Sequence, residues 1–243
     1  MEFKAILFDL YGTLIDIETD EHMDEVYRGI AHFLTYLGID RRTHEVKDQY
    51  WGIIEEQKKA TTEKYLEINV EASWQTFLTR EGKKRTPQNK QLAILLAQLF
   101  RALSRKRLKL YPDVIEVLES LAPRYALSLV SDAQPCFALP EMRAMGLSHY
   151  FQPTIISEEY GFRKPDQRLF DKALSMLKID ASQAIFVGND MYRDIYGAKR
   201  AGLKTVFFAS NQGAQTHNDT KPDYVAYRFT EVLDGISFLE QDQ

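Results

Sequence analysis

The chain has 243 residues, of which 44 % are hydrophobic and 27 % are charged, and its formal net charge is −4. These proportions are typical of a globular protein with enough apolar residues for a substantial core. A negative net charge provides no overall attraction to nucleic acid or to anionic membranes, so we expect neither as a partner.

Cysteine usage and the N-terminal segment indicate the compartment. Cys136 is the only cysteine in the sequence, so the chain cannot form an internal disulfide, which agrees with a reducing compartment. No stretch is as long as a membrane span, and the N-terminus lacks the basic lead and long apolar run of a signal peptide. We therefore expect a cytoplasmic protein, and the sequence leaves the choice between monomer and homodimer open.

The first predicted strand spans residues 4–8 and is followed directly by Asp9. Its sequence, Lys-Ala-Ile-Leu-Phe, is the short apolar run of a strand buried inside a parallel sheet. Gly12 allows a tight backbone turn after it, and Thr13 adds a hydroxyl nearby. A carboxylate at this position suits a nucleophile. Taken alone, the same residue also fits an aspartate that caps a turn.

Residues 17–107 look entirely helical, because apolar residues recur there at three- and four-residue steps. The residues that carry this pattern include Met23, Val26, Ile30, Leu92, Leu96 and Leu99. Thr86 and Pro87 are typical of a helix N-cap and of the first helical residue. The pattern predicts an all-helical cap domain of residues 17–107, inserted into a core domain of residues 1–16 and 108–243.

Some cap residues admit two interpretations. We expect Trp51, Tyr65 and Trp74 to pack in the core of the cap, and the alternative is that they line a substrate pocket. We expect the basic run at residues 80–85 to be an exposed helix junction, and the alternative is that it attracts an anionic substrate.

Further apolar runs follow the cap and predict strands. They span residues 126–130, 154–156, 184–187, 204–208 and 224–226. Apolar residues at helical spacing lie between them, near residues 114–121 and 169–177. Alternating strands and helices predict a Rossmann-like α/β fold with a parallel sheet, whose ligands bind at the carboxyl ends of the strands. We expect the polar tail after Ser237 to be frayed.

Two further candidate residues follow the cap. Ser131 comes directly after a predicted strand, where a hydroxyl could hold an oxyanion, although a turn serine has the same pattern. Lys164 lies in the motif Gly161-Phe-Arg-Lys-Pro-Asp-Gln-Arg-Leu-Phe170, and Pro165 fixes the backbone beside it. A lysine considered alone is usually a solvated surface charge.

The last motif is Phe186-Val-Gly-Asn-Asp-Met-Tyr-Arg-Asp194, in which two carboxylates follow a predicted strand. Asp190 and Asp194 are four residues apart, so they can share one face of a helix. Like charges at this spacing repel unless a cation joins them. The alternative is that they are acidic residues at a helix N-terminus, where the helix dipole favours negative charge.

In order, spacing and strand context, these features resemble those of the haloacid dehalogenase superfamily, which includes many phosphatases. The most specific signals are Phe8-Asp-Leu-Tyr-Gly-Thr-Leu14 and Lys164-Pro-Asp-x-x-x-Phe170. The resemblance covers almost the whole chain, with a helical cap inserted after the first motif.

The resemblance implies a catalytic role for several residues. Asp9 would attack the substrate and form a covalent aspartyl intermediate, Ser131 would hydrogen-bond the transferring group, and Lys164 would neutralise charge. The residues assigned to substrate binding are Gly12, Thr13 and Asp132.

The resemblance also implies a Mg²⁺ site. Asp9, Asp190 and Asp194 would hold the cation together with the backbone carbonyl of Tyr11, since Mg²⁺ prefers oxygen ligands. The substrate would then be a small phosphorylated metabolite.

Tyr11 departs from the pattern of most phosphatases in this superfamily, which carry a second aspartate at that position. That aspartate protonates the leaving oxygen and later activates water. Tyr11 is still a catalytic candidate, because a phenol with an ordinary pKa near 10 can donate a proton, but it is a poor base at neutral pH. Dehalogenases of the superfamily carry Asp-x-Tyr-Gly-Thr, as this chain does, and a halide leaves without a proton.

The fourth motif favours a phosphatase instead. A phosphate dianion near Asp9 meets like charge, at a cost of roughly 4 kcal/mol per pair of unit charges at 4 Å. A cation held by Asp190 and Asp194 would offset this repulsion, whereas dehalogenases act on a monoanionic 2-haloacid without metal. We therefore predict a phosphatase, with a 2-haloacid dehalogenase and a non-catalytic binding protein on the same fold as the alternatives.

Overall fold

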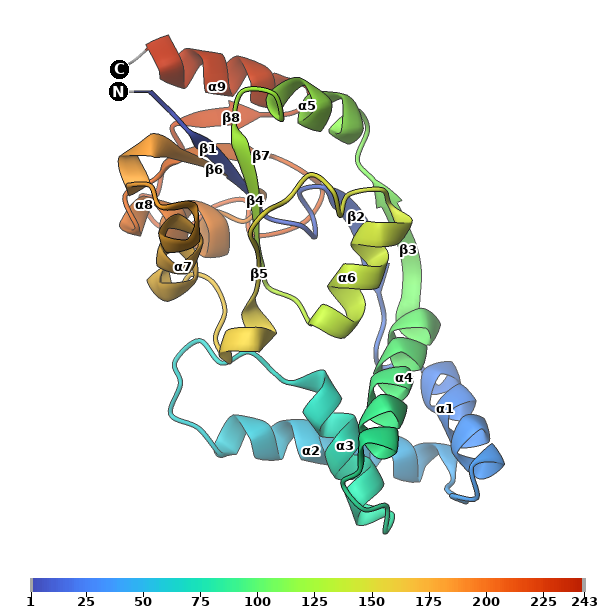
Figure 1. Ribbon diagram of the computed structural model, residues 1–243. Helices are drawn as coiled ribbons and strands as arrows, with labels where there is room; N and C mark the ends of the chain where they lie inside the picture. The colour runs from blue at the N-terminus through green and yellow to red at the C-terminus, as the bar shows by residue number, and fades with distance from the viewer. Residues whose placement is uncertain (1, 242–243) are drawn as a thin grey trace.

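The computed structural model describes residues 2–241 and contains a six-stranded parallel sheet in the order β5-β4-β1-β6-β7-β8 (Figure 1). Every strand predicted from the sequence is present, and the predicted α/β fold is confirmed. The strands are β1 Ala5–Phe8, β4 Ala126–Ser131, β5 Thr154–Ile156, β6 Ala184–Gly188, β7 Lys204–Phe208 and β8 Tyr224–Ala226.

Helices cover both faces of the sheet because the strands are apolar on both sides. Side chains alternate along β1, so Ile6 and Phe8 pack on one face while Ala5 and Leu7 pack on the other. The first face is covered by α5 Val114–Leu121, α6 Pro135–Ala144 and α9 Glu231–Gln241. The second is covered by α7 Gln167–Leu177 and α8 Gly197–Arg200. Short helical turns complete the sheet domain: η1 Ser157–Tyr160, η2 Ala181–Gln183 and η3 Met191–Tyr196.

Four helices after the first strand form a separate body with its own apolar core (Figure 1). They are α1 Asp24–Tyr36, α2 Thr43–Lys59, α3 Val70–Arg80 and α4 Pro87–Ser104. Trp74 is fully buried and stacks on Tyr50, with ring centroids 4.6 Å apart. Trp51 packs against the same cluster, so the predicted structural role of both tryptophans is confirmed.

The predicted start of α4 is also confirmed. The hydroxyl of Thr86 accepts a hydrogen bond from the Asn89 backbone N–H at 3.2 Å, and Pro87 is the first helical residue. The basic run at residues 80–85 joins the two helices and is largely exposed, as expected for a helix junction.

The prediction that residues 17–107 are entirely helical is wrong at both ends. Strand β2, Ile15–Thr19, pairs antiparallel with β3, Arg105–Leu110, and this ribbon joins the helical body to the sheet domain. Opposite charges face each other across it, as in the 2.7 Å ion pair between Arg107 and Glu18. The two strands are far apart in sequence and carry many charges, so local apolar periodicity did not reveal their pairing.

The prediction of a frayed tail after Ser237 is wrong for the described residues. Helix α9 continues to Gln241 because Ile236 and Leu239 are buried against the core beneath it. Residues 242 and 243 lie outside the described part of the chain. No helix within residues 2–241 is both long enough and apolar enough to cross a membrane.

Candidate active site

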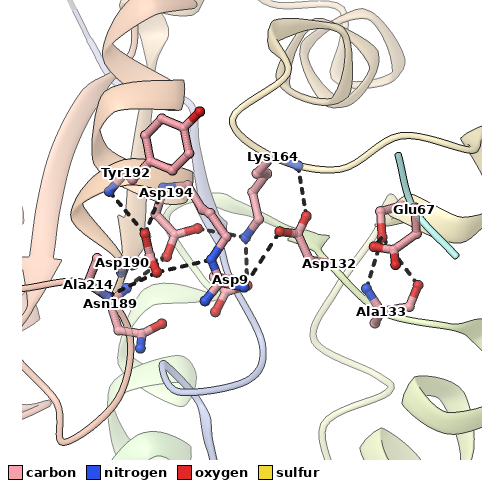
Figure 2. A network of polar contacts seen from close by, with 12 residues as sticks. Asp9, Glu67, Asp132, Ala133, Lys164, Asn189, Asp190, Tyr192, Asp194 and Ala214 are labelled. Carbon is pink, nitrogen blue, oxygen red and sulfur yellow. Dashed lines mark hydrogen bonds and ion pairs between the residues drawn. The ribbon is translucent and has the colours of Figure 1, made fainter. Parts of the chain in front are cut away.

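The carboxyl ends of three neighbouring strands bring the main predicted residues together. Asp9 follows β1, Ser131 ends β4, and Asp194 lies in η3 just after β6. Lys164 comes from the loop before α7 and points into the same place (Figure 2). All four side chains are buried.

Lys164 joins the two central carboxylates. Its Nζ lies 2.6 Å from Asp9 Oδ1 and 2.7 Å from Asp194 Oδ1. Burial opposes the charge on this ammonium group, but the carboxylates of Asp194 and Asp9 outweigh it and raise the pKa of Lys164 above its ordinary value. Lys164 is therefore a buried cation fixed beside the proposed nucleophile, and not a surface charge.

Asp132 positions the Lys164 loop. One oxygen of its carboxylate, Oδ1, accepts a hydrogen bond from the Lys164 backbone N–H at 2.9 Å. The other, Oδ2, has no hydrogen-bond partner within residues 2–241 and lies 3.9 Å from Arg193 Nη1. Burial raises the pKa of Asp132.

Asp194 is held by the start of its own helical turn. Its Oδ2 accepts the backbone N–H groups of Asn189 and Asp190, each at 3.0 Å. Burial is the largest influence on this carboxyl and raises its pKa to about 6, although Lys164 acts in the opposite direction. Both of its oxygens are thus engaged, one with the backbone and one with Lys164.

The carboxylate of Asp190 has a different set of partners. It is the N-cap of η3, and its Oδ1 accepts the backbone N–H groups of Tyr192 and Arg193. Its Oδ2 accepts from the Ala214 N–H and from Arg193 Nε, both at 3.0 Å. These hydrogen bonds lower the pKa of Asp190 even though burial alone would raise it. All of these contacts tie Asp190 to η3 and the loop at 214, and its role as a metal ligand stays a prediction.

Asn189 lies closer to the nucleophile and was not assigned from the sequence. The Thr13 hydroxyl lies 3.1 Å from Asp9 Oδ2 and 3.1 Å from Asn189 Oδ1, between the two oxygens. Gly12 has a φ of +90°, and a Cβ there would lie 2.3 Å from Asn189 Nδ2, so glycine is required at that position. The only sequence signal for Asn189 was its place inside the fourth motif.

Ser131 presents a free hydroxyl to the site. The residue is 1 % exposed, and its Oγ has no hydrogen-bond partner within the described residues. A buried polar atom without a partner is uncommon and costs stability. Such an atom at the end of β4, the strand next to β1, is suited to bind an oxygen of a substrate.

The phenol of Tyr11 is directed to a different group. Its hydroxyl donates a hydrogen bond to the carboxylate of Glu141 on α6. Arg101 of α4 donates to the same carboxylate at 2.7 Å and lies 5.1 Å from the centre of the Tyr11 ring. Burial, followed by the charge of Glu141, raises the pKa of Tyr11 well above 10. Glu141 and Arg101 are distant in the sequence, so no local motif pointed to them.

A segment between α2 and α3 contacts the sheet domain beside the site. Glu67 is buried there and accepts a hydrogen bond from Ser157 Oγ at 2.6 Å (Figure 2). The same Ser157 hydroxyl accepts the Ala133 backbone N–H at 2.9 Å. Burial raises the pKa of Glu67 to about 7. No sequence motif singled out Glu67, because its burial depends on the contact between the two bodies.

The charge balance of the site is suited to a divalent cation. The carboxylates of Asp9, Asp132, Asp190 and Asp194 meet two cationic side chains, Lys164 and Arg193. Carboxylate and amide oxygens are the donors that Mg²⁺ prefers. No group of three or more His, Cys, Asp or Glu side chains within residues 2–241 has the arrangement of a preformed metal site. The residues therefore fit a cation by charge and donor type. In this structure the Lys164 ammonium group lies between the carboxylates of Asp9 and Asp194.

Comparisons with known proteins identify similar sequences. The family model for haloacid dehalogenase-like hydrolases matches residues 3–202. A glyceraldehyde 3-phosphate phosphatase from Methanopyrus kandleri is 28 % identical over 243 residues, covering 98 % of this chain and 99 % of that protein. Another, from Pyrococcus furiosus, is 32 % identical over 118 residues, which is 49 % of each chain. A pyrimidine 5′-nucleotidase from Escherichia coli is 24 % identical, covering 99 % of this chain and 98 % of that protein.

Solved structures have the same fold. A 2-haloacid dehalogenase from Pseudomonas syringae superposes with a TM-score of 0.72 at 23 % identity, covering 97 % of this chain and 99 % of that one. A phosphatase from Thermococcus onnurineus gives 0.61 at 22 % identity, covering 96 % and 98 %. At these identities the likeness shows the fold alone, and it includes both kinds of enzyme.

Proposed function

The chain belongs to the haloacid dehalogenase-like hydrolases, and from this premise we propose that it is a Mg²⁺-dependent phosphatase. It would act on a small phosphorylated metabolite through an aspartyl-phosphate intermediate. The observation that carries the proposal is the surplus of buried carboxylates around Lys164, with the unpartnered Ser131 hydroxyl at the end of the neighbouring strand β4.

Asp9 would perform the central step. A carboxylate oxygen of Asp9 forms a bond to phosphorus while the bond from phosphorus to the ester oxygen breaks. The leaving oxygen keeps the bonding electrons and takes a proton from water. A second water then cleaves the aspartyl phosphate and releases inorganic phosphate. The Ser131 hydroxyl would donate to a phosphoryl oxygen, and the Lys164 ammonium would offset negative charge on Asp9 and the phosphate.

The cation would be held by oxygens that meet at this edge of the sheet. The candidate ligands are the carboxylates of Asp9 and Asp194, the Tyr11 carbonyl and the Asn189 amide oxygen. Asp194 would have to release Lys164 or a backbone N–H to bind the cation. Asp190 would likewise have to give up hydrogen bonds to η3 and the loop at 214. When bound, Mg²⁺ supplies positive charge against the phosphate dianion.

The names of the similar proteins support a phosphate monoester as substrate. The matched sequences include glyceraldehyde 3-phosphate phosphatases, a phosphoserine phosphatase from Thermus thermophilus, and the E. coli nucleotidase. These proteins differ in the alcohol that leaves, so the shared element is the phosphoryl group.

The division into domains is part of this proposal. We assign residues 1–16 and 108–243 to the catalytic core and residues 17–107 to a cap over the active-site edge of the sheet. The hydrogen bonds of Glu67 with Ser157 and of the Tyr65 carbonyl with the Arg163 backbone N–H are consistent with this assignment. The cap would provide substrate selectivity.

A 2-haloacid dehalogenase is the second candidate, and Tyr11 is the observation that favours it. No carboxylate occupies that position, and a halide needs no proton when it leaves. This reaction would use Asp9 as nucleophile without metal and would release halide from 2-chloropropionate.

Release of phosphate from p-nitrophenyl phosphate, with and without Mg²⁺, tests the first proposal. We expect Mg²⁺-dependent release that disappears in an Asp9→Asn variant. Release of halide from 2-chloropropionate without phosphate release would support the dehalogenase instead. Ligand binding with no turnover of either substrate would identify a non-catalytic protein.

A further inference from the structure

A cavity of about 560 Å³ lies between the helical cap and the active site. Its lining includes Lys64 and Tyr65 from the cap and Arg163, Lys164 and Tyr192 from the core. Lys164 lines this cavity and also contacts Asp9. A phosphate ester whose phosphorus faces Asp9 would therefore place its leaving group here. The sequence prediction that Tyr65 packs in the cap core is wrong, because Tyr65 lines this cavity.

The walls of the cavity are strongly basic. Five of the residues that line it are Lys or Arg, and none of those identified is acidic. Three of the five already have carboxylate partners: Lys58 pairs with Glu55, Lys164 with Asp9 and Asp194, and Arg193 with Asp190. Lys64 and Arg163 form no ion pair in the part of the chain that the structure describes. Both are exposed and available to a ligand.

Lys64 comes from the cap and Arg163 from the core. The Lys64 ammonium lies 4.9 Å from the centre of the Tyr65 ring, which holds it at the cap wall. The Arg163 backbone N–H donates to the Tyr65 carbonyl at 2.8 Å, and Leu66 forms an antiparallel bridge with Phe162. The backbone of the cap is thereby fixed against the core next to Lys164.

Aromatic hydroxyls add neutral donors to the same cavity. Tyr65 of the cap and Tyr192 of the core both line it. In Figure 2 the Tyr192 ring points away from the carboxylate cluster around Lys164. Beyond the reaction centre, a ligand would therefore meet two unpaired cations and two hydroxyl groups.

We infer that this cavity is a second anion site, which selects small phosphate esters whose leaving group carries a carboxylate or a second phosphate. Lys64 and Arg163 pair with that second anion, while the reacting phosphate occupies the site of Asp9, Ser131 and Lys164. The inference rests on the proposed phosphatase function for the position of the reacting phosphate. It goes beyond that function by naming the chemical class of the leaving group.

Binding of non-hydrolysable phosphonates tests the second anion site without turnover. The probes are 3-carboxybenzylphosphonate and its neutral counterpart 3-carbamoylbenzylphosphonate, measured by titration calorimetry in the presence of Mg²⁺. Wild-type protein is expected to bind the carboxylate about tenfold more tightly than the amide. The preference should weaken at high salt, because the two cations are exposed. A third probe, m-xylylene bisphosphonate, distinguishes a second phosphate from a carboxylate.

The decisive variant is Lys64→Gln combined with Arg163→Gln, and Lys59→Gln is the matched control because Lys59 is exposed nearby without lining the cavity. The double variant should bind both monophosphonates with similar affinity, and the control should keep the tenfold preference. The inference would be overturned if wild-type protein bound the carboxylate and amide probes with equal affinity, or bound neither. It would also be overturned if the double variant still preferred the carboxylate probe. Absence of p-nitrophenyl phosphate turnover, with the binding preference intact, would instead refute the proposed phosphatase and leave the anion site standing.

Discussion

The Tyr11 hydroxyl donates a hydrogen bond to the Glu141 carboxylate, although Tyr11 is only two residues past Asp9. Glu141 is in turn held by Arg101 from the cap helix α4. The phenol therefore links the nucleophile loop to α6 and to the cap. Its raised pKa and its acidic partner both oppose a role as general base.

A Tyr11→Phe variant should keep its catalytic activity. A general acid or base contributes about 10²–10⁴-fold to a rate, whereas we expect kcat for p-nitrophenyl phosphate to change by about twofold or less. The variant should lose about 1–3 kcal/mol of stability, because a buried hydrogen bond to a charged group is removed. Tyr125→Phe, which removes a Tyr–Glu hydrogen bond to Glu240 outside the site, is the matched control. A hundredfold fall in kcat for Tyr11→Phe alone would contradict this assignment.

The lack of a carboxylate at position 11 predicts a preference for good leaving groups. An aryl or acyl oxygen leaves without full protonation, but an alkoxide does not. We expect kcat/KM for p-nitrophenyl phosphate to exceed that for an alkyl phosphate by at least about 10²-fold, the usual contribution of a general acid. Steady-state kinetics on the two substrates measure this ratio. Similar values would mean that another group protonates the leaving oxygen.

Ser131 and Ser128 make a matched pair on β4. Both are buried, but Ser128 Oγ donates to the Pro153 carbonyl at 2.8 Å while Ser131 Oγ has no partner among the described residues. Ser131→Ala should leave the melting temperature unchanged or higher and reduce kcat/KM by about 10–10²-fold, because a hydrogen bond to the reacting group is lost. Ser128→Ala should lower stability by about 1 kcal/mol with little effect on kcat/KM. The reverse pattern would assign Ser131 to structure.

Glu67 should make stability depend on pH. Its pKa rises from 4.5 to about 7 on folding, mainly through burial, so the folded protein binds this proton more tightly. The contribution of the protonated Glu67 side chain to the free energy of unfolding is therefore complete below about pH 4.5, and it is lost as pH rises through about 7. It amounts to at most about 3 kcal/mol. Chemical denaturation between pH 5 and 8 should show a flatter profile for Glu67→Gln, which stays neutral, and greater stability than wild type at pH 8. Parallel profiles would show that Glu67 ionises normally in the folded state.

Asn189 and Asp190 are neighbours with different expected roles. Asp190→Ala removes the N-cap of η3 and should cost about 1–2 kcal/mol of stability. Asn189→Ala should instead raise the Mg²⁺ concentration for half-maximal activity by about tenfold or more, since it removes an oxygen beside Asp9. Thermal unfolding without Mg²⁺ and Mg²⁺ titration of activity separate the two effects. If Asp190→Ala alters Mg²⁺ activation more than Asn189→Ala does, the sequence-based assignment of Asp190 is correct.

The local sequence was sufficient to predict the α/β fold and to identify the residues at the carboxyl ends of the strands. Strands such as residues 4–8 are apolar on both sides, and helices such as α7 have a single apolar face, so short-range patterns specify them. Asp9, Ser131 and Asp194 follow such strands, and parallel topology brings their ends to one edge. Lys164 could be identified because its motif is specific.

Only the tertiary structure decided which partners these side chains have. Asp190 and Asn189 are adjacent in one motif, yet one carboxylate caps a helical turn while the neighbouring amide contacts Thr13 beside the nucleophile. Tyr11 meets Glu141, and the cap segment with Lys64 meets Arg163, through contacts between distant segments. Periodicity reports which side of an element is buried. It does not report which distant group completes a hydrogen bond or a charge pair, because that depends on how the cap and the sheet pack together.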